Sequence, residues 1–456
     1  MNKMIQIPAF TLAALIAAKA ILSFQHTAHV APVNPKSYVL DVAIDGASSY
    51  QISMWVPFGS TSDSVPGIAH LMEHLKFKSE DGNGFVAFDA IAGSSSNAST
   101  TYLTTRYDLN VPASGFAVAL ETLSKMTAPL QVTQASLDLE KNIVVQELFQ
   151  RTQSNPDTPF YQKFSSELYK GFPFENPPIG TQEKIEAIKM EDVTGFDKSY
   201  YQASRTFLSI TGPTLSATAQ DAVEEFFPNS AVAKVAIGHK TDPILIDDEF
   251  EGLGAFLSDL PKPTIETSEF KSEAISQRTT TVKMSISKIV TAPTPWHEIA
   301  AARVLNDIIN SRLPEGLYSR ISDEPRLAQN WSFGLYKLLS GVWQIDFNGE
   351  LESNVGAEQL RTTVESYLAA LSANGISQAS FDRVKARYFL TGEWENPTSR
   401  AANLATDSVE DGYDNAISFY TELQSVKLSD VNQLLKITQL PGRIGVALLK
   451  PQGSAQ

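Results

Sequence analysis

The segment Gly67-Ile-Ala-His70-Leu-Met-Glu73-His74-Leu-Lys-Phe-Lys78 holds two of the six histidines in this 456-residue chain. Two histidines four residues apart lie on one face of a helix, so their imidazoles can converge on one zinc ion. Glu73, three residues after His70, can reach a metal-activated water without binding the metal itself. The spacing H-x-x-E-H therefore predicts a metal-binding helix with Glu73 as its catalytic group.

A catalytic zinc site uses three protein ligands and keeps one position open. The segment Glu140-Lys-Asn-Ile-Val-Val-Gln-Glu147 is a source of the third ligand, because its two glutamates are two helical turns apart and share a face. That face also carries Ile143 and Val144, which favours an inward orientation. Spacing alone favours a solvated helix with scattered acids, but the histidine pair shifts the balance towards a ligand.

The chain contains an internal duplication. One copy runs from Asp192 through a helical stretch to a strand and Pro213, and the other runs from Asp430 to Pro451 with the same spacing. Each aspartate is expected to be a helix N-cap. The position of the copies near the ends of the two halves indicates two related domains.

Hydrophobic periodicity predicts the same order of elements in both halves. Strands are expected at 38–44, 50–56, 107–111, 207–210, 280–286, 342–349 and 444–448, and helices at 68–76, 116–126, 298–309 and 357–371. We therefore predict an α+β fold, with a zinc-bearing domain over 35–228, a linker over 229–268 and a homologous domain over 269–456.

Residues 1–30 have the layout of a secretory signal peptide. Lys3 precedes an apolar stretch that is too short to span a bilayer, and Ala18-Lys19-Ala20 resembles a cleavage site. We expect export to the periplasm, without stable membrane insertion after processing. An uncleaved tail or a membrane anchor is the alternative. The net charge of −15 argues against nucleic acid as a partner.

The first half resembles the pitrilysin/insulinase family of zinc peptidases, the M16-type inverted zincins. Its shorter two-domain branch, which includes the mitochondrial processing peptidases, fits the length best. The resemblance covers most of 38–213, and its motifs are Gly67–Lys78, Asn97-Ala-Ser-Thr100, Thr105-Arg-Tyr107, the glutamates 140 and 147, and Pro177–Gly180. It implies two homologous domains of mixed or antiparallel sheet, flanked by helices and facing each other around a chamber.

The resemblance also assigns roles to individual residues. It implies that His70, His74 and Glu147 bind one zinc ion per chain, that Glu73 is the general base, and that Glu140 supports the ligands. Family members hold an extended peptide against an exposed strand edge. The matching segment here contains Ser96, Asn97, Ala98 and Ser99.

The second half lacks the metal-binding pair, and we expect it to be inactive. His297 stands alone at the start of the helix expected at 298–309. Active single-chain relatives carry an arginine and a tyrosine here that grip the substrate. Arg320 and Arg326 are candidates for the arginine, but Gln329 stands where the tyrosine is expected. We therefore hypothesise a homodimer or heterodimer in which a related chain supplies the missing grip.

The expected function is that of a zinc-dependent endopeptidase that hydrolyses short or unfolded peptides, alone or as the catalytic subunit of a heterodimer. The alternative is a non-catalytic structural or peptide-binding subunit of the same fold. Such subunits typically have damaged zinc motifs, whereas His70, Glu73, His74 and Glu147 are all present here. The intact motif favours the enzyme.

Overall fold

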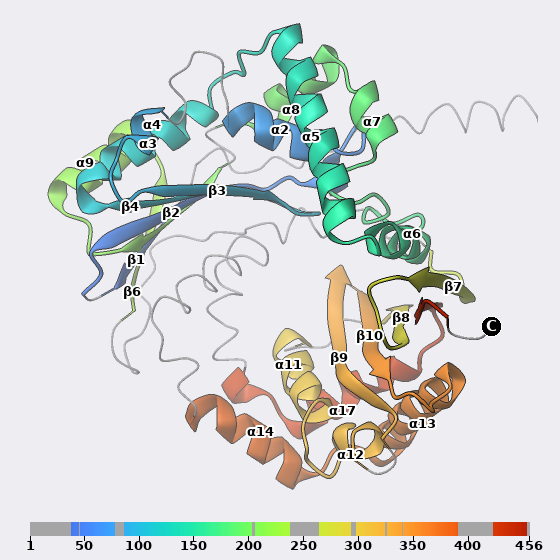
Figure 1. Ribbon diagram of the computed structural model, residues 1–456. Coiled ribbons are helices and arrows are strands. Elements are labelled where there is room, and N and C mark those ends of the chain that lie inside the picture. The colour runs from blue at the N-terminus through green and yellow to red at the C-terminus, as the bar shows by residue number, and fades with distance from the viewer. Residues whose placement is uncertain are drawn as a thin grey trace, which may run out of the picture. The chain divides into compact units, whose positions relative to one another are not determined.

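The computed structural model describes residues 38–44, 46–77, 86–202, 206–237, 264–292, 298–323, 326–339, 341–390 and 423–453. Two mixed sheets with flanking helices account for most of these residues (Figure 1). The predicted signal peptide and His297 lie outside the described residues. Within those residues, no helix has the length and apolar character needed to cross a membrane.

The first half forms a six-stranded sheet in the order β3-β4-β2-β5-β1-β6. Its strands are β1 Tyr38–Ile44, β2 Ser49–Val56, β3 Ser95–Thr100, β4 Thr105–Pro112, β5 Phe207–Gly212 and β6 Ala231–Ile237. β1 runs parallel to β5 and β6, and the other neighbours are antiparallel. β3 is therefore an edge strand, with β4 as its sheet partner in the described part of the chain.

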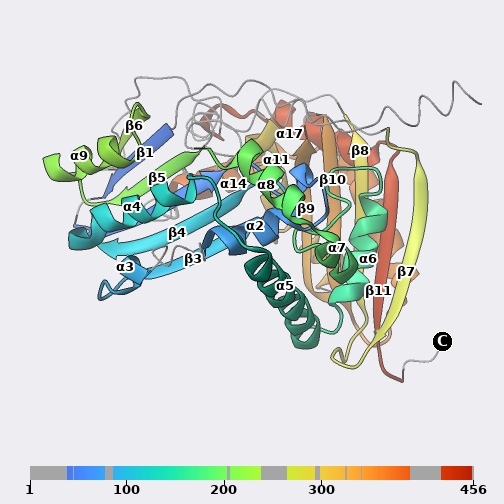
Figure 2. The same ribbon diagram turned by 90° about the horizontal axis from the view of Figure 1, so that it is seen from above.

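The helices of the first half are α2 Ile68–Phe77, α3 Val86–Asp89, α4 Phe116–Met126, α5 Gln134–Ser154, α6 Thr158–Leu168, α7 Gln182–Ala187, α8 Met190–Tyr200 and α9 Ala217–Phe226, with short 3-10 turns at Ser60–Ser62 and Ala113–Gly115. All of them except α6 contribute buried apolar residues to one core with this sheet. In α2, apolar side chains recur at helical spacing, and Ile68, Leu71 and Met72 are fully buried. Figure 1 shows α2, α4, α5 and α8 on the same side of the sheet, and Figure 2 shows α5 beside α2.

The second half forms a five-stranded sheet in the order β7-β11-β8-β10-β9. Its strands are β7 Ser268–Ser276, β8 Lys283–Thr291, β9 Ala328–Leu339, β10 Val342–Leu351 and β11 Arg443–Pro451. Its helices are α11 Glu298–Ile309, α12 Tyr318–Ile321, α13 Ala357–Asn374, α14 Gln378–Leu390 and α17 Leu428–Leu435, followed by a 3-10 turn, η4, at Lys436–Gln439. A continuous apolar core joins α11, α13 and α17 to one face of this sheet.

The two sheets repeat one topology, as the duplication predicts. β7, β8, β9, β10 and β11 take the places in the second sheet that β1, β2, β3, β4 and β5 take in the first. In each half, the first strand runs parallel to the strand that closes the repeat. The α+β fold with two homologous sheets is therefore confirmed, and β6 is an addition to the first sheet.

The N-cap prediction for Asp192 and Asp430 is wrong. Both are the third residue of their helix, and each carboxylate accepts a hydrogen bond of 2.9 Å from the backbone nitrogen of the capping lysine, Lys189 or Lys427. The acidic side chain reaches back towards the helix start, as in a capping box. The two copies share this geometry, which strengthens the duplication.

Helix α6 belongs to the first half in sequence but packs on the second sheet. Its Phe164 and Leu168 share a buried cluster with Ile289, Val342 and Ala447. Ile289 alternates along β8 with the residues that face α11 and α13, so α6 covers the opposite face. Figures 1 and 2 both show α6 close to the second sheet.

Polar contacts accompany this packing. The Tyr169 hydroxyl donates a hydrogen bond of 2.6 Å to Gln344 Oε1, and the Arg443 guanidinium donates to the carbonyls of Leu168 and Lys170 at 3.0 and 2.7 Å. The predicted linker, 229–268, overlaps β6 and the first residue of β7, while 238–263 lie outside the described residues. The domain boundaries stay a prediction.

Candidate metal centre

The start of α2 is fixed by Asp63. Its carboxylate accepts hydrogen bonds from the backbone nitrogens of Gly67 and Ala69, at 2.6 and 3.0 Å. Burial raises the pKa of Asp63 to about 7, against the lowering effect of these two bonds. Gly67 has a φ of +94°, and a side chain there would collide with Ile185. The helix that carries the histidines therefore begins at a defined place and angle.

The predicted metal ligands come together. Among the described residues, one group of three or more His, Cys, Asp or Glu side chains could hold a metal ion, and it consists of His70, His74 and Glu147. Their donor atoms all lie within 4.8 Å of one another. Glu147 Oε2 is 3.6 Å from His70 Nε2 and 3.3 Å from His74 Nε2. Two imidazole nitrogens and one carboxylate oxygen are a donor set typical of catalytic zinc.

Helix α5 supplies the carboxylates around this group. Glu140 and Val144 are buried, and Glu147 lies on the same face two turns from Glu140. Glu140 Oε2 is 3.4 Å from His74 Nδ1, so Glu140 and Glu147 hold the two nitrogens of one ring. When Nε2 of a histidine binds a metal, a carboxylate at Nδ1, the position that Glu140 takes here, fixes the orientation of the ring.

Burial and charge separate the ionisation of the two histidines. Burial lowers the pKa of His70 to about 4. Burial also acts to lower the pKa of His74, but Glu140 and Glu147 outweigh it and raise that pKa to about 9. The hydrogen bond with His74 lowers the pKa of Glu147 to about 2. Near neutral pH, His74 is therefore protonated, whereas His70 is neutral and Glu147 is ionised.

Glu73 lies beside this group, on the same helix. It is 8 % exposed, and its Oε2 accepts a hydrogen bond of 2.5 Å from the Thr100 hydroxyl. Burial raises the pKa of Glu73, whereas the bond from Thr100 and the charge of His74 lower it. A buried carboxyl with a raised pKa is suited to both taking and giving a proton.

The strand edge predicted for the substrate leads towards Glu73. Residues 96–99 all lie on β3, the edge strand whose last residue is Thr100. Their side chains are exposed or half-buried. The predicted substrate residues are therefore on an accessible edge that ends at the partner of Glu73.

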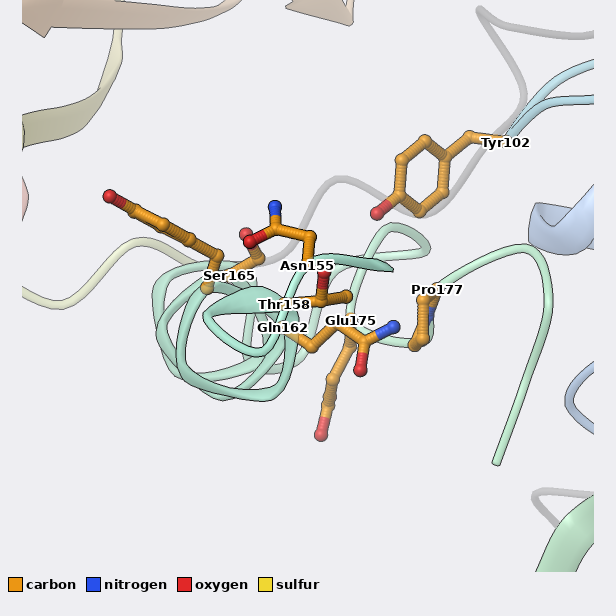
Figure 3. Close-up of a pocket in the computed structure, with 8 residues that line it drawn as sticks. Tyr102, Asn155, Thr158, Gln162, Ser165, Glu175 and Pro177 are labelled. Carbon is orange, nitrogen blue, oxygen red and sulfur yellow. The ribbon is translucent and has the colours of Figure 1, made fainter. Parts of the chain in front are cut away.

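A cavity of about 210 Å³ lies beyond the end of β3. In Figure 3, the Tyr102 side chain, from the turn after β3, points towards the residues of α6. The lining residues are Tyr102, Asn155, Thr158, Tyr161, Gln162, Ser165, Glu175 and Pro177. Hydroxyl and amide groups predominate among them, so this region offers mainly hydrogen-bonding side chains.

The other predicted site residues lie elsewhere in the fold. Arg320 is exposed on α12 and Arg326 is exposed just before β9, so both belong to the second half. Helix α11 contains no histidine, and Glu298 at its start pairs with Lys337.

Sequence reasoning missed three residues that shape the site. Thr100 was part of a recognised motif but had no assigned role. Arg151 pairs with Glu147 one turn along α5, and the i, i+4 spacing was a readable signal. Asp63 caps α2, and an acid shortly before an apolar run is a typical start signal.

Family models match both halves. The model described as "Insulinase (Peptidase family M16)" matches residues 38–182, and the model described as "Peptidase M16 inactive domain" matches residues 187–388. The chain therefore belongs to the insulinase family of peptidases, peptidase family M16.

Similar proteins are named as zinc proteases. The zinc protease PqqE of Helicobacter pylori is 23 % identical over 409 residues, which cover 85 % of this chain and 86 % of that protein. The uncharacterized zinc protease Rv2782c of Mycobacterium tuberculosis is 24 % identical over 420 residues, or 89 % of each chain.

Solved structures share the fold. A protease from Helicobacter pylori superimposes with a TM-score of 0.72 at 19 % identity, over 92 % of this chain and 98 % of that one. The periplasmic protease PqqL from Escherichia coli gives a TM-score of 0.69 at 14 % identity, over 91 % of this chain and 47 % of that one.

Proposed function

We propose that this chain is a zinc-dependent endopeptidase in which His70, His74 and Glu147 hold one zinc ion and Glu73 is the general base. The observation that carries the proposal is the convergence of the three donor atoms within 4.8 Å beside the buried Glu73. The names of the relatives support zinc and proteolysis as a class. Glu140 supports the site by holding the His74 ring.

The protein's own groups have separate tasks. A bound zinc ion would polarise the peptide carbonyl and lower the pKa of a water molecule. Glu73 takes a proton from the attacking water and returns it to the leaving amine. The Thr100 hydroxyl keeps the Glu73 carboxylate in one orientation throughout. The raised pKa of Glu73 suits this double role.

The substrate is an extended peptide that adds to the edge of β3 along Ser96, Asn97, Ala98 and Ser99. Backbone pairing of this kind needs a segment without structure of its own, which favours short or unfolded peptides. The half-buried and exposed side chains of β3 support an accessible edge. Arg320 and Arg326 are further candidates for gripping the substrate.

We also propose export and assembly for this chain. The layout of residues 1–30 supports a periplasmic location, and one protein of similar fold is a periplasmic protease. Gln329, at the place where a tyrosine is expected, supports a homodimer or heterodimer with a related chain. A non-catalytic subunit of the same fold is the alternative function.

The test is cleavage of unstructured peptides by the purified, zinc-loaded chain beside its Glu73→Gln variant. We expect equal zinc content in both proteins and a loss of at least ~100-fold in kcat for the variant. Glu121→Gln, at an exposed surface ion pair, is the matched control and should retain full activity. Zinc-loaded protein that cleaves no peptide, also after purification with any native partner, would establish the non-catalytic alternative.

A further inference from the structure

A lysine interrupts the apolar face of a central strand in the second sheet. Along β8, Met284, Ile286, Lys288 and Val290 point to the same side, because side chains alternate along a strand. The other three are buried in the core that α11, α13 and α17 complete. Lys288 is half-buried there, between cross-strand neighbours Ile345 and Ile444.

The duplication shows what an ordinary core would have at this place. Ile286 is the counterpart of Met54. Each is opposite the same position of the duplicated segment, which lies on β11 in the second sheet and on β5 in the first. Two residues later, Lys288 stands where the first half has Val56, which is fully buried. Burying a lysine at a core position destabilises the folded state unless its charge is paired and hydrogen-bonded.

The Lys288 side chain lines a cavity of about 490 Å³. This volume is in the range of small-molecule sites. The cavity lies between the sheet and α13, with η4 at its side. Its apolar walls include Phe333, Phe347 and Leu368, all of which are buried.

The ammonium of Lys288 retains donors for a ligand. Among the described residues it makes one hydrogen bond, of 3.1 Å, to the carbonyl oxygen of Thr438, and an ammonium has three donors. Glu365 acts on Lys288 only through its charge, and its carboxylate is hydrogen-bonded to Arg361. Arg361 also forms two bonds with Glu269, at 2.5 and 2.8 Å.

We propose that this cavity binds a small aliphatic carboxylate. The carboxylate meets the ammonium of Lys288, and the hydrocarbon body fills the space beside Phe333, Phe347 and Leu368. Charge complementarity selects an anion, because Lys288 donates to a neutral carbonyl while the neighbouring carboxylates are engaged by Arg361. The apolar walls select a hydrocarbon chain over a bare inorganic anion. The proposal is independent of peptidase activity.

Calorimetric titration with laurate, beside dodecanol of the same chain length, tests the proposal. We expect saturable binding of laurate to the full-length protein and at least ~10-fold weaker binding of dodecanol, because the dodecanol hydroxyl can accept a hydrogen bond from Lys288 but carries no charge to pair with the ammonium. Lys288→Met keeps most of the stem and should weaken laurate binding by about 10- to 100-fold.

Lys283→Met is the matched control, since Lys283 lies on the same strand but pairs with Glu350 at the surface. It should bind laurate like the wild type, and both variants should keep the wild-type peptidase activity. Absence of saturable laurate binding to the wild type, or equal binding by Lys288→Met, overturns the proposal. The wild-type comparison of laurate and dodecanol holds even if a variant folds poorly.

Discussion

The Thr100 hydroxyl donates a hydrogen bond of 2.5 Å to Glu73 Oε2, and this bond joins the end of edge strand β3 to α2, the helix that carries His70 and His74. Strand β3 is the proposed docking edge and Glu73 the proposed base. A peptide that adds to β3 would therefore reach the group that activates water at the last residue of the strand. Thr100 is a positioning residue in this scheme.

Replacing Thr100 by valine removes the hydroxyl with little change in volume. We expect kcat to fall by about 10- to 100-fold, because a hydrogen bond to a charged group contributes about 1.5–3 kcal/mol. KM and zinc content should stay near the wild-type values, since neither ligands nor strand edge change. Steady-state kinetics with metal analysis checks this.

Thr100→Ser is the control that separates positioning from packing. Serine retains the hydroxyl, so the variant should keep most of the wild-type kcat. Thr362→Val, the same substitution at an exposed position of α13, should leave kcat unchanged. If Thr100→Val is as active as the wild type while Glu73→Gln is inactive, the positioning role fails and the proposed function stands.

Zinc binding should release about one proton per chain near neutral pH. His74, whose pKa is raised to about 9, is then protonated, whereas His70, whose pKa is lowered to about 4, is neutral. The metal displaces the proton on His74, so apparent affinity rises with pH up to about 9. Calorimetry in buffers of different ionisation enthalpy measures the release, and a value of zero or two protons at neutral pH would contradict it.

A buried ion pair supports the end of α2. Lys76 Nζ is 2.5 Å from Asp197 Oδ1 and donates to the Ala128 carbonyl at 2.8 Å. Asp197→Leu leaves the Lys76 charge buried and should destabilise the protein by about 3–5 kcal/mol. Lys76→Met combined with Asp197→Leu should cost less than that single change. Chemical denaturation of both variants tests this, and equal midpoints would rule out charge burial as the cause.

Asp63→Ala should destabilise α2 by about 1–2 kcal/mol, because two backbone nitrogens at the helix start lose their acceptor. Zinc affinity should fall as well, since His70 lies in the first turn of this helix. Asp63→Asn keeps an acceptor oxygen and should be milder in both measurements. Thermal denaturation and zinc titration are the readouts, and a stronger effect of asparagine than of alanine would exclude a capping role.

Elements with strong local signals were predicted closely. The expected helices 116–126 and 298–309 have the bounds of α4 and α11, because an amphipathic pattern fixes both their period and their extent. The strand expected at 280–286 is found at Lys283–Thr291. Lys288 interrupts the alternation of apolar residues, so the predicted strand ended before the end of β8.

Other features depend on contacts that no local pattern encodes. The serine run of β3 has no apolar alternation, and only the family resemblance identified it as a strand. The packing of Phe164 against Ile289 joins residues more than a hundred positions apart in the chain. The histidine pair was predicted from spacing, but the bond from Thr100 to Glu73 requires the sheet register that brings β3 beside α2.

Helix α6 has a consequence for the history of the duplication. A fragment that ends after the first sheet would present Phe164 and Leu168 to water, and the complementary fragment would lack the cover of Ile289 and Val342. Each half thus completes its folding with surface from the other. The two halves are therefore not interchangeable units, because each has apolar surface that only the other half covers.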